Sequence, residues 1–357
     1  CLLVRNLYGH RLAGLYWERF CTKHLFAAGF TKVSGWECLF VHRQQKLFMS
    51  VYVDDFKMAG NKANLKAMWK TLSKNMDIDD LVPMENNVYL GCKQTSCTPL
   101  QRDVKTKSDY LASVMAEHLR KGKAITEPEA KKRSEGQPSA AVSTPPMHKV
   151  RGYQYDMCGH AEQCVARYLE MAKQDVSSLK RVATPCIPED QLPPEDFEVK
   201  GALTPVAAKI VLKGLYLARL GRPDILWAVN ARAREVTKWN VACDKRLHRL
   251  TCYIHFSKSW VTTSWVGDKA QDCKLMLFVD AGFAGDLRDS KSTTGSFLVL
   301  VGPQTWAPLS WMCKKQVPIS HSSSEAEVIA LEAALRLEGI PALLFWDEVI
   351  AVFGNLP

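Results

Sequence analysis

The chain has 357 residues, 47% of them apolar, and its formal net charge at pH 7 is +10. The length and the apolar content predict two or three domains, each large enough to bury a core. The composition excludes a membrane-spanning protein, because no apolar run is long enough to cross a bilayer, and no signal peptide is visible. The basic charge favours a polyanionic partner.

Twelve cysteines are scattered along the chain without a C-x-x-C pair, which predicts reduced thiols in an intracellular protein. The nearest approach to a metal-binding cluster is the group Cys158, His160 and Cys164. A zinc site there is the weaker alternative, because a fourth ligand and the usual spacing are missing. Since the sequence starts at Cys1 and stops abruptly at Pro357, we expect it to be a piece of a longer protein.

Residues 1–94 form one predicted block, in which strand patterns surround an acidic pair. Helices are predicted around 11–28 and near 62–75. Between them the pattern runs from a first strand through a polar turn to a second strand, then through Asp54 and Asp55 to a third strand. This order predicts that the two acids occupy the tip of a β-hairpin.

The adjacent acids Asp54 and Asp55 have two interpretations. Aspartate tolerates tight turns, so an ordinary surface turn explains the pair on the local pattern alone. Alternatively, carboxylates held on stiff strands supply the hard oxygen ligands that Mg²⁺ takes in two-metal phosphoryl-transfer sites.

The middle of the chain changes composition twice. Over 95–155 we expect a charged insertion or linker that is disordered in part, because 119–150 is poor in apolar residues and rich in charge, Pro and Ser. Helical patterning returns at 158–174, and a Pro-rich extended connector follows it. A second helical region is predicted over 204–260, with one buried face formed by Ile225, Val229, Ala233 and Val236.

Basic side chains surround that buried face. Such charge usually marks a solvated surface, and contact with nucleic-acid phosphates is the competing interpretation. The residues concerned are Arg232, Arg234, Lys238, Lys245, Arg246 and Arg249.

The last block combines three predicted strands, a helix and several acids. A first strand ends in Asp280, and further strands are predicted over 291–302 and 307–316. Serines that can cap the N-terminus precede a predicted helix over 322–339, with Glu325 and Glu327 in its first turns. The helix dipole explains the two glutamates, but it does not explain an aspartate at the end of a strand in the same unit.

Several phrases together resemble the polymerase region of copia-type LTR retrotransposons. NLYGHRLAGLYW resembles the family's LYGLKQAPRAW, and VYVDD resembles the YxDD box of reverse transcriptases. YLGCKQ and YLARLGRPDILWAVN follow in the family's order. The stretch from VDAGFAGD to SSSEAEVIAL resembles the family's long ribonuclease H segment. The resemblance covers most of the chain, except about 95–155.

The resemblance implies a reverse transcriptase, an RNA-directed DNA polymerase, joined to a ribonuclease H, both of which use Mg²⁺. Asp54 and Asp55 match the catalytic and metal-binding acids of the polymerase. Tyr52 would then lie under the primer terminus, and Gly91, within YLGCKQ, would support the primer grip.

For the ribonuclease H part, the resemblance implies that Asp280 is the catalytic, metal-binding acid of the first strand. Glu327 is the matching helix carboxylate, because the family places its glutamate directly before an apolar run, and Glu325 is the alternative. Nucleic-acid contact is then expected from the basic helices, through Arg232, Arg234, Lys245, Arg246 and Arg249.

The implied fold class is a multi-domain α+β or α/β protein. Its expected parts are a partial reverse-transcriptase palm over 1–94, the linker over 95–155, a helical thumb or connection region over 156–265, and an incomplete ribonuclease H-like mixed sheet with helices, truncated at its C-terminus, over 272–357. The implied partners are RNA, DNA, RNA–DNA hybrids, deoxynucleoside triphosphates and the remainder of the polyprotein, without a membrane. The implied location is intracellular, in a cytoplasmic particle or the nucleus.

The sequence also departs from the family pattern. Leu12 stands where the family has a glutamine near the incoming nucleotide. The first palm aspartate would lie upstream of Cys1 and the later ribonuclease H aspartates beyond Pro357, and Asp347 is no substitute because it lies on the polar side of a predicted helix. We therefore expect the isolated chain to carry part of each metal site and to be inactive.

Two rival hypotheses remain. The chain is either an enzyme fragment or a degenerate, host-retained protein that binds nucleic acid without catalysis. The intact acids favour the first hypothesis, and Leu12 favours the second. An unrelated basic scaffold is the least favoured hypothesis, because the matching phrases occur in the family's order.

Overall fold

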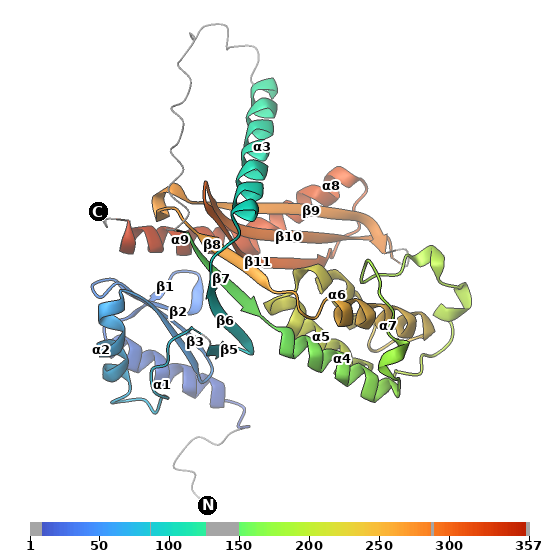
Figure 1. Cartoon of the computed structure of the whole chain (residues 1–357), viewed down its shortest axis with the longest axis horizontal. Helices are drawn as coiled ribbons and strands as arrows, with labels where there is room; N and C mark the ends of the chain where they lie inside the picture. The colour runs from blue at the N-terminus through green and yellow to red at the C-terminus, as the bar shows by residue number, and fades with distance from the viewer. Residues whose placement is uncertain (1–8, 86, 126–149, 287–288, 355–357) are drawn as a thin grey trace, which may run out of the picture. The chain divides into compact units, whose positions relative to one another are not determined.

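The structure is a computed structural model, and it describes residues 9–85, 87–125, 150–286 and 289–354 (Figure 1). The chain divides into two compact units. The smaller unit comprises Cys1–Leu90 and Leu335–Pro357, and the larger unit comprises Gly91–Ala334. Both units combine helices with β-structure, so the predicted mixed α/β organisation is confirmed. Within the described residues, no helix is both long enough and apolar enough to cross a membrane.

The smaller unit is built on an antiparallel sheet in the order β1-β2-β3-β4, in which each strand pairs with the next one along the chain. Its helices begin and end close to the predicted positions 11–28 and 62–75. Its elements are α1 (Ala13–Ala27), β1 (Thr31–Val33), β2 (Trp36–His42), β3 (Leu47–Tyr52), β4 (Asp55–Gly60), α2 (Lys62–Leu72), β5 (Asn87–Tyr89), a π-helical turn (Leu335–Gly339) and α9 (Ile340–Phe353).

Both faces of this sheet are covered, because successive side chains of a strand point to opposite faces. Leu47 and Met49 of β3 pack with Leu25 of α1 and Leu72 of α2 in one buried cluster. Phe48, between them, belongs to a second cluster with Val352 of α9. The sheet therefore lies between α1 and α2 on one side and α9 on the other.

Helix α9 is attached to the sheet by polar contacts as well as by packing. The Arg43 guanidinium forms an ion pair with Glu348, with Nε and Oε1 separated by 2.7 Å, and this partner raises the pKa of Arg43. The Trp36 indole N–H donates to the carbonyl of Pro341 at 2.8 Å. Residues 335–354 thus belong to the smaller unit, whereas the sequence predicted one block over 272–357. The predicted helix around Asp347 is confirmed, and that side chain is exposed.

The larger unit contains a longer antiparallel arrangement in the order β6-β7-β8-β11-β10-β9. The strand predicted over 291–302 is confirmed as β10. Its elements are β6 (Cys92–Cys97), α3 (Gln101–Ile125), β7 (Arg151–Asp156), α4 (Cys158–Ala172), α5 (Ala207–Leu220), α6 (Leu226–Ala233), α7 (Val241–Phe256), β8 (Thr262–Val266), β9 (Lys274–Asp286), β10 (Lys291–Gly302), β11 (Thr305–Lys315) and α8 (Ser323–Ala334), with short 3₁₀ turns at Val176–Ser178, Glu189–Gln191, Pro194–Phe197, Pro223–Ile225 and Ala270–Asp272.

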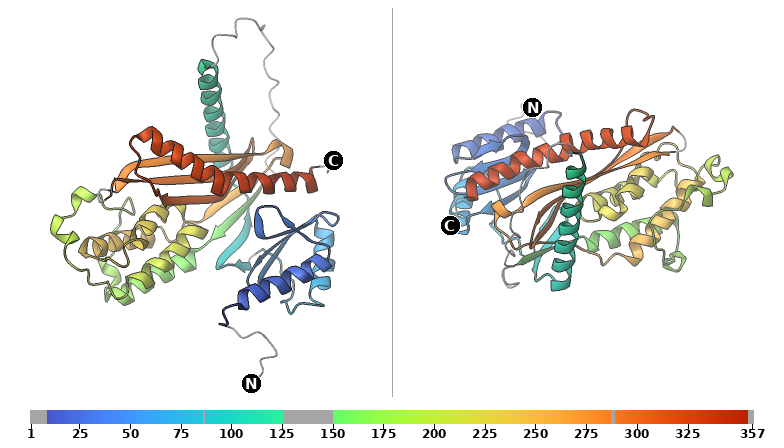
Figure 2. Two further views of the ribbon diagram at one scale, coloured as in Figure 1. Left: turned by 180° about the vertical axis from the view of Figure 1, so that it is seen from behind. Right: turned by 90° about the horizontal axis from the view of Figure 1, so that it is seen from above.

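The two faces of this sheet carry different side chains. On one face, Val299 and Val301 of β10 are buried in a cluster with Val104 and Leu111 of α3. On the opposite face, Thr294 accepts a hydrogen bond from the Gln316 amide, which also donates to a backbone carbonyl of α8. Ala326, Ala330 and Ala334 of α8 are fully buried, so this helix packs closely on β9 and β10, as Figure 2 shows.

The segment 95–155 differs from the expected linker. It contains the end of β6, helix α3 and most of β7, while residues 126–149 lie outside the described residues. Helix α3 forms because Val104 and Leu111, two turns apart, bury one apolar stripe against the sheet. The high charge of the segment hid this sparse stripe.

Helices α4, α5, α6 and α7 form one apolar cluster that includes the face predicted from the sequence. Ile225 and Val229 are fully buried, and Ala233 and Val236 pack at the edge of the same cluster. Trp311 of β11 joins the helices to the sheet, because its indole N–H donates to the carbonyl of Ala218 at 2.9 Å.

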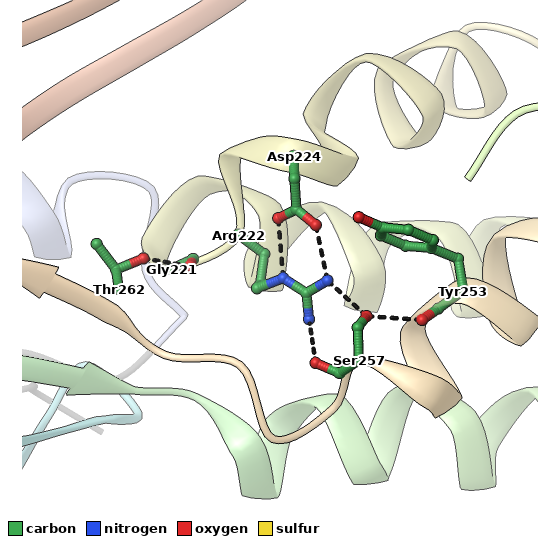
Figure 3. A network of polar contacts seen from close by, with 6 residues as sticks. All are labelled: Gly221, Arg222, Asp224, Tyr253, Ser257 and Thr262. Atoms are coloured by element: carbon green, nitrogen blue, oxygen red, sulfur yellow. Dashed lines mark hydrogen bonds and ion pairs between the residues drawn. The ribbon is translucent and has the colours of Figure 1, made fainter. Parts of the chain in front are cut away.

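A buried arginine connects the turn before α6 to the end of α7 (Figure 3). Arg222 donates to both carboxylate oxygens of Asp224, at 2.8 and 2.7 Å, and to the carbonyl and hydroxyl oxygens of Ser257, at 2.9 and 2.7 Å. The rings of Tyr253 and Trp260 lie 5.9 and 5.4 Å from the guanidinium. Only 4% of the Arg222 side chain is exposed, so the fold depends on these partners to hold a charge out of water.

Replacing Asp224 by alanine should lower the free energy of unfolding by about 3–5 kcal/mol, because it leaves the buried Arg222 without its counter-charge. The measurement is the urea midpoint of the larger unit's transition. The control is Glu162→Ala, which removes an exposed partner of Lys258 and should cost less than about 1 kcal/mol. Equal midpoints for the two variants would contradict this role of the Arg222 network.

Candidate functional site

The predicted β-hairpin around Asp54 and Asp55 is confirmed. Strands β3 and β4 pair from Leu47 opposite Gly60 to Tyr52 opposite Asp55, which leaves Val53 and Asp54 as a two-residue loop. Tyr52 is 57% exposed, and both aspartates are exposed. The hairpin therefore presents two adjacent carboxylates at its tip, beside an aromatic ring.

The backbone of this loop is strained at Val53. Its φ of 54° lies in the left-handed region, which a β-branched residue rarely adopts. Two-residue hairpin loops need such angles to match the twist of the strands. The protein thus holds a valine where glycine or asparagine is usual, and this strain of roughly 1–3 kcal/mol has to be offset by its surroundings.

Trp17 of α1 supplies part of that support. Its indole N–H donates to the Val53 carbonyl at 2.6 Å, and its ring meets Phe56 of β4 edge-on, with 6.3 Å between ring centres. The local sequence pattern does not single out Trp17 as a functional residue. The nearest available signal was its place in the NLYGHRLAGLYW phrase, because nothing local indicates a contact 36 residues away.

The donor set of the hairpin suits a hard cation. Mg²⁺ is usually held by one or two carboxylates together with water and substrate phosphates, and exposed Asp54 and Asp55 offer that chemistry. Among the residues that the structure describes, no group of three or more His, Cys, Asp and Glu side chains is arranged to hold a metal ion.

Asp280 does not end its strand, contrary to the prediction. It lies inside β9, which continues to Asp286, and it pairs with Gly295 of β10. Its side chain is exposed, and alternation along the regular pairing places it on the sheet face of Phe278 and Gly282. Pairing of Ala281 with Thr294 and of Gly282 with Thr293 extends the strand past Asp280.

The two candidate glutamates of α8 have different surroundings. Glu325 accepts a hydrogen bond from the backbone N–H of His321 at 2.7 Å, and its own N–H donates to the Ser322 hydroxyl at 3.1 Å. This reciprocal arrangement caps the helix, as the preceding serines predicted. Glu327 is exposed, which favours it over Glu325 as a carboxylate available to a ligand. Helix α8, which carries Glu327, packs on the sheet face of Thr294, whereas Asp280 is on the face of Phe278.

The three residues of the alternative zinc site, Cys158, His160 and Cys164, are in surroundings that do not favour metal binding. His160 Nε2 lies 3.1 Å from the carbonyl oxygen of Lys213. Burial raises the pKa of the Cys158 thiol to about 11 and that of Cys164 to about 12, so neither is poised as the thiolate that zinc needs. These three residues form no metal-binding group among those described.

Most of the basic residues predicted to contact nucleic acid have partners within the protein. Arg232 is buried and pairs with buried Glu235 at 3.0 Å, which favours a structural role over the phosphate contact expected for it. Lys245 pairs with Asp196, Arg246 with Glu189, and Arg249 donates to the Thr184 carbonyl. Arg234 and Lys238 are exposed, and the described residues provide neither with a hydrogen-bond or ion-pair partner.

The structure also describes two other positions singled out in the sequence, Gly91 and Leu12. Gly91 has a φ of 74°, so the YLGCKQ phrase needs glycine at a left-handed position. Leu12 is 44% exposed and immediately precedes α1. An apolar side chain there supplies no polar group for a ligand.

Comparisons with known proteins give a family match over the part of the chain that contains the hairpin. A family described as "Reverse transcriptase (RNA-dependent DNA polymerase)" matches residues 1–128. Over 92% of its length the chain is 22% identical to the Retrovirus-related Pol polyprotein from transposon RE1 of Arabidopsis thaliana and 23% identical to that from transposon TNT 1-94 of Nicotiana tabacum. It spans 18% and 21% of these relatives, or about a fifth of their length.

A shorter relative is the Secreted RxLR effector protein 161 of Plasmopara viticola, which is 30% identical over 122 residues, or 34% of this chain and 81% of the relative. No solved structure matches the chain. These matches support a fragment of a retrotransposon Pol polyprotein, with a reverse-transcriptase match over residues 1–128.

The Trp17 contact gives a test of the hairpin geometry. Trp17→Phe keeps the ring and removes the N–H donor, so the amides around Val53 should lose hydrogen-exchange protection by about 1 kcal/mol. Adding Val53→Gly should restore the protection, because glycine adopts a positive φ without steric cost.

The matched control for this test is Trp69→Phe, which removes an indole N–H donor to the Asp79 carbonyl elsewhere in the same unit. It should leave the hairpin amides unchanged. Identical protection of these amides in the wild-type and Trp17→Phe proteins would show that Trp17 does not support the loop.

Proposed function

We propose that the chain is part of an RNA-directed DNA polymerase joined to a ribonuclease H in a copia-type retrotransposon polyprotein. The observation that carries the proposal is the pair of exposed carboxylates, Asp54 and Asp55, at the tip of a two-residue hairpin. The hairpin lies inside the stretch that matches the reverse-transcriptase family, which favours a catalytic pair over an ordinary surface turn.

In this proposal each part of the hairpin has a role. Asp54 on the loop and Asp55 at the start of β4 hold Mg²⁺, with Asp54 as the more direct ligand. When bound there, such ions would supply charge stabilisation for the oxygens of phosphoryl transfer. Tyr52 offers its exposed ring to the primer terminus, and Trp17 fixes the loop, so that the carboxylates keep their positions as substrate binds.

The ribonuclease H part of the proposal rests on Asp280 and Glu327. Helix α8 packs on β9 and β10 through buried alanines, on the sheet face opposite to that of Asp280, so each carboxylate is proposed on its own exposure and not on contact between them. Both carboxylates are exposed and offer hard oxygen donors. Their proposed task is to position water for cleavage of the RNA strand in a hybrid.

The remaining assignments follow from the same proposal. Residues 1–94 act as part of the palm, 156–265 as the thumb or connection region, and 272–334 contribute the ribonuclease H-like part, since residues 335–354 belong to the smaller unit. The proposed partners are RNA, DNA, deoxynucleoside triphosphates and the rest of the polyprotein, inside the cell. Because the chain spans about a fifth of its polyprotein relatives, the activity of the whole protein is a proposal here.

A second candidate function is nucleic-acid binding without catalysis. The chain matches 81% of a relative that is not named as a Pol polyprotein, the Secreted RxLR effector protein 161, which favours a role outside the polymerase. Leu12, at a position where the resemblance leads us to expect a glutamine, also favours it. Under this hypothesis the carboxylates are remnants and the exposed cations carry the function.

Catalysis should need both carboxylate pairs joined to further parts of the polyprotein, because two metal ions require more ligands than either pair offers. We expect little turnover from the isolated chain. In a longer Pol polypeptide, Asp54→Asn should lower primer extension on an RNA template by about 100-fold or more, and Asp280→Asn should do the same for hybrid cleavage alone.

The measurements for this prediction are primer extension and hybrid cleavage by the two variants, side by side with Asp347→Asn. That control removes an exposed carboxylate of α9 outside both pairs and should retain both activities. Robust extension that survives Asp54→Asn would overturn the polymerase assignment. Loss of neither activity in any variant would overturn both assignments.

Binding of an RNA–DNA hybrid should weaken steeply as salt rises, because cations of the protein replace counterions of the phosphates. Arg234→Gln should reduce the slope of log K against log salt by about 1, since this exposed guanidinium has no described partner. Lys258→Gln, at an ion-paired cation outside the basic cluster, is the control and should keep the slope. Affinity that is independent of salt would contradict phosphate contact.

A further inference from the structure

The larger unit contains a groove of about 640 Å³ that the proposed catalytic carboxylates do not line. One wall is the Pro-rich segment 184–189, which the sequence predicted to be extended. A second wall is the exposed side of α6 together with Arg234, and the third is the edge formed by Gly282, Gly285 and Thr293. This volume lies in the range of sites that bind small molecules.

The groove offers an aromatic surface. Trp227 lines it, and 48% of this residue is exposed, although tryptophan normally buries its ring. Proline and alanine side chains of the neighbouring walls leave flat apolar surface next to the indole. An exposed indole in a concave, apolar setting is suited to stacking against a planar ring.

The charge in the groove selects an anionic ligand. Three arginines and two glutamates line it, which gives a net charge of +1. Arg232 is neutralised by Glu235, and Arg246 by Glu189. Arg234 is exposed and has no partner among the described residues, so its guanidinium is available for a phosphate.

The absence of a side chain at Gly282 leaves space in the groove. A Cβ atom added at Gly282 would meet the Thr293 carbonyl oxygen at 3.9 Å and Cβ at 4.0 Å, which are ordinary contacts. The strand itself therefore does not require glycine at this position. Gly282 keeps the groove unfilled, and a β-branched residue there would occupy it without strain on β9.

We propose that this groove binds one unpaired nucleotide, with its base stacked on Trp227 and its phosphate paired with Arg234. The inference goes beyond the proposed function, because it needs neither Mg²⁺ nor the carboxylates of either catalytic pair. A single-stranded nucleic acid would place one nucleotide in the groove, and a free nucleoside monophosphate contains the whole recognised group.

The test is calorimetric titration of the full chain with adenosine 5′-monophosphate in the presence of EDTA. Adenosine and inorganic phosphate are titrated separately. We expect saturable binding of the nucleotide, and affinities at least about tenfold lower for either half alone, because stacking and the ion pair each contribute. Binding of inorganic phosphate as tightly as the nucleotide would overturn the stacking role of Trp227.

Variants of the groove complete the test. Gly282→Val should abolish binding by filling the groove, whereas Gly295→Val, on the same sheet face but outside the groove, should retain it. Trp227→Ala should lower the affinity about tenfold, and Trp227→Phe should recover most of it. Arg234→Gln should reduce the preference for the nucleotide over adenosine.

Two results would overturn the proposal. One is the absence of nucleotide binding by the wild-type chain, and the other is unchanged affinity in folded Gly282→Val and Trp227→Ala proteins. Far-ultraviolet circular dichroism and thermal unfolding show whether each variant is folded. Because EDTA removes divalent metal ions, failure here leaves the catalytic proposal intact, and loss of catalysis in the aspartate variants leaves this proposal intact.

Discussion

The pairing register of β3 with β4 is the constraint on which the candidate site depends. It sets the hairpin loop at two residues and thereby decides that Asp54 lies on the loop and Asp55 at the start of the return strand. A slip of one residue would reverse the face of every side chain. Buried Leu47 and Met49 prevent such a slip, because it would move both out of the core. The apolar core of the smaller unit therefore positions two exposed charges that make no contact with it.

The same unit shows how strain is distributed around a site. Val53 adopts a left-handed angle that the loop demands, and a tryptophan from a distant helix supports its carbonyl. A glycine would form this loop more easily. Val53 is 63% exposed, which leaves apolar surface next to the carboxylates.

Local pattern was enough to predict the hairpin, strand β10, and the helices around Ile225 and Val229, because each has a clear period and clear turn residues. It was not enough for α3, whose charge concealed two apolar contacts with the sheet. It could not show that Glu348 and its helix belong to the smaller unit, because the contact with Arg43 spans 305 residues. Local pattern also could not predict the contact of Trp17 with the hairpin. The same holds for the pairing that extends β9 past Asp280.

The fold also changes how the basic residues of the chain are interpreted. A cluster around α6 and α7 predicted phosphate contact, but Arg232 and Arg246 pair with carboxylates close by. Ion pairing of this kind occupies these arginines within the protein, while the net charge of +10 still acts at long range. Arg234 and Lys238 are the exposed members of the cluster for which the described residues provide no partner, and Arg234 lines the groove.

The central claim is that Asp54 and Asp55 hold a divalent metal ion at the hairpin tip. The most direct measurement is the broadening of the Trp17 indole N–H signal by Mn²⁺ in nuclear magnetic resonance spectra, because this group donates to the residue beside Asp54. Comparison with Trp17→Phe assigns the signal. Broadening at substoichiometric Mn²⁺ that disappears in the Asp54→Asn, Asp55→Asn double variant is the predicted result. Equal broadening in the double variant, or none in the wild-type protein under saturating Mn²⁺, would contradict the claim.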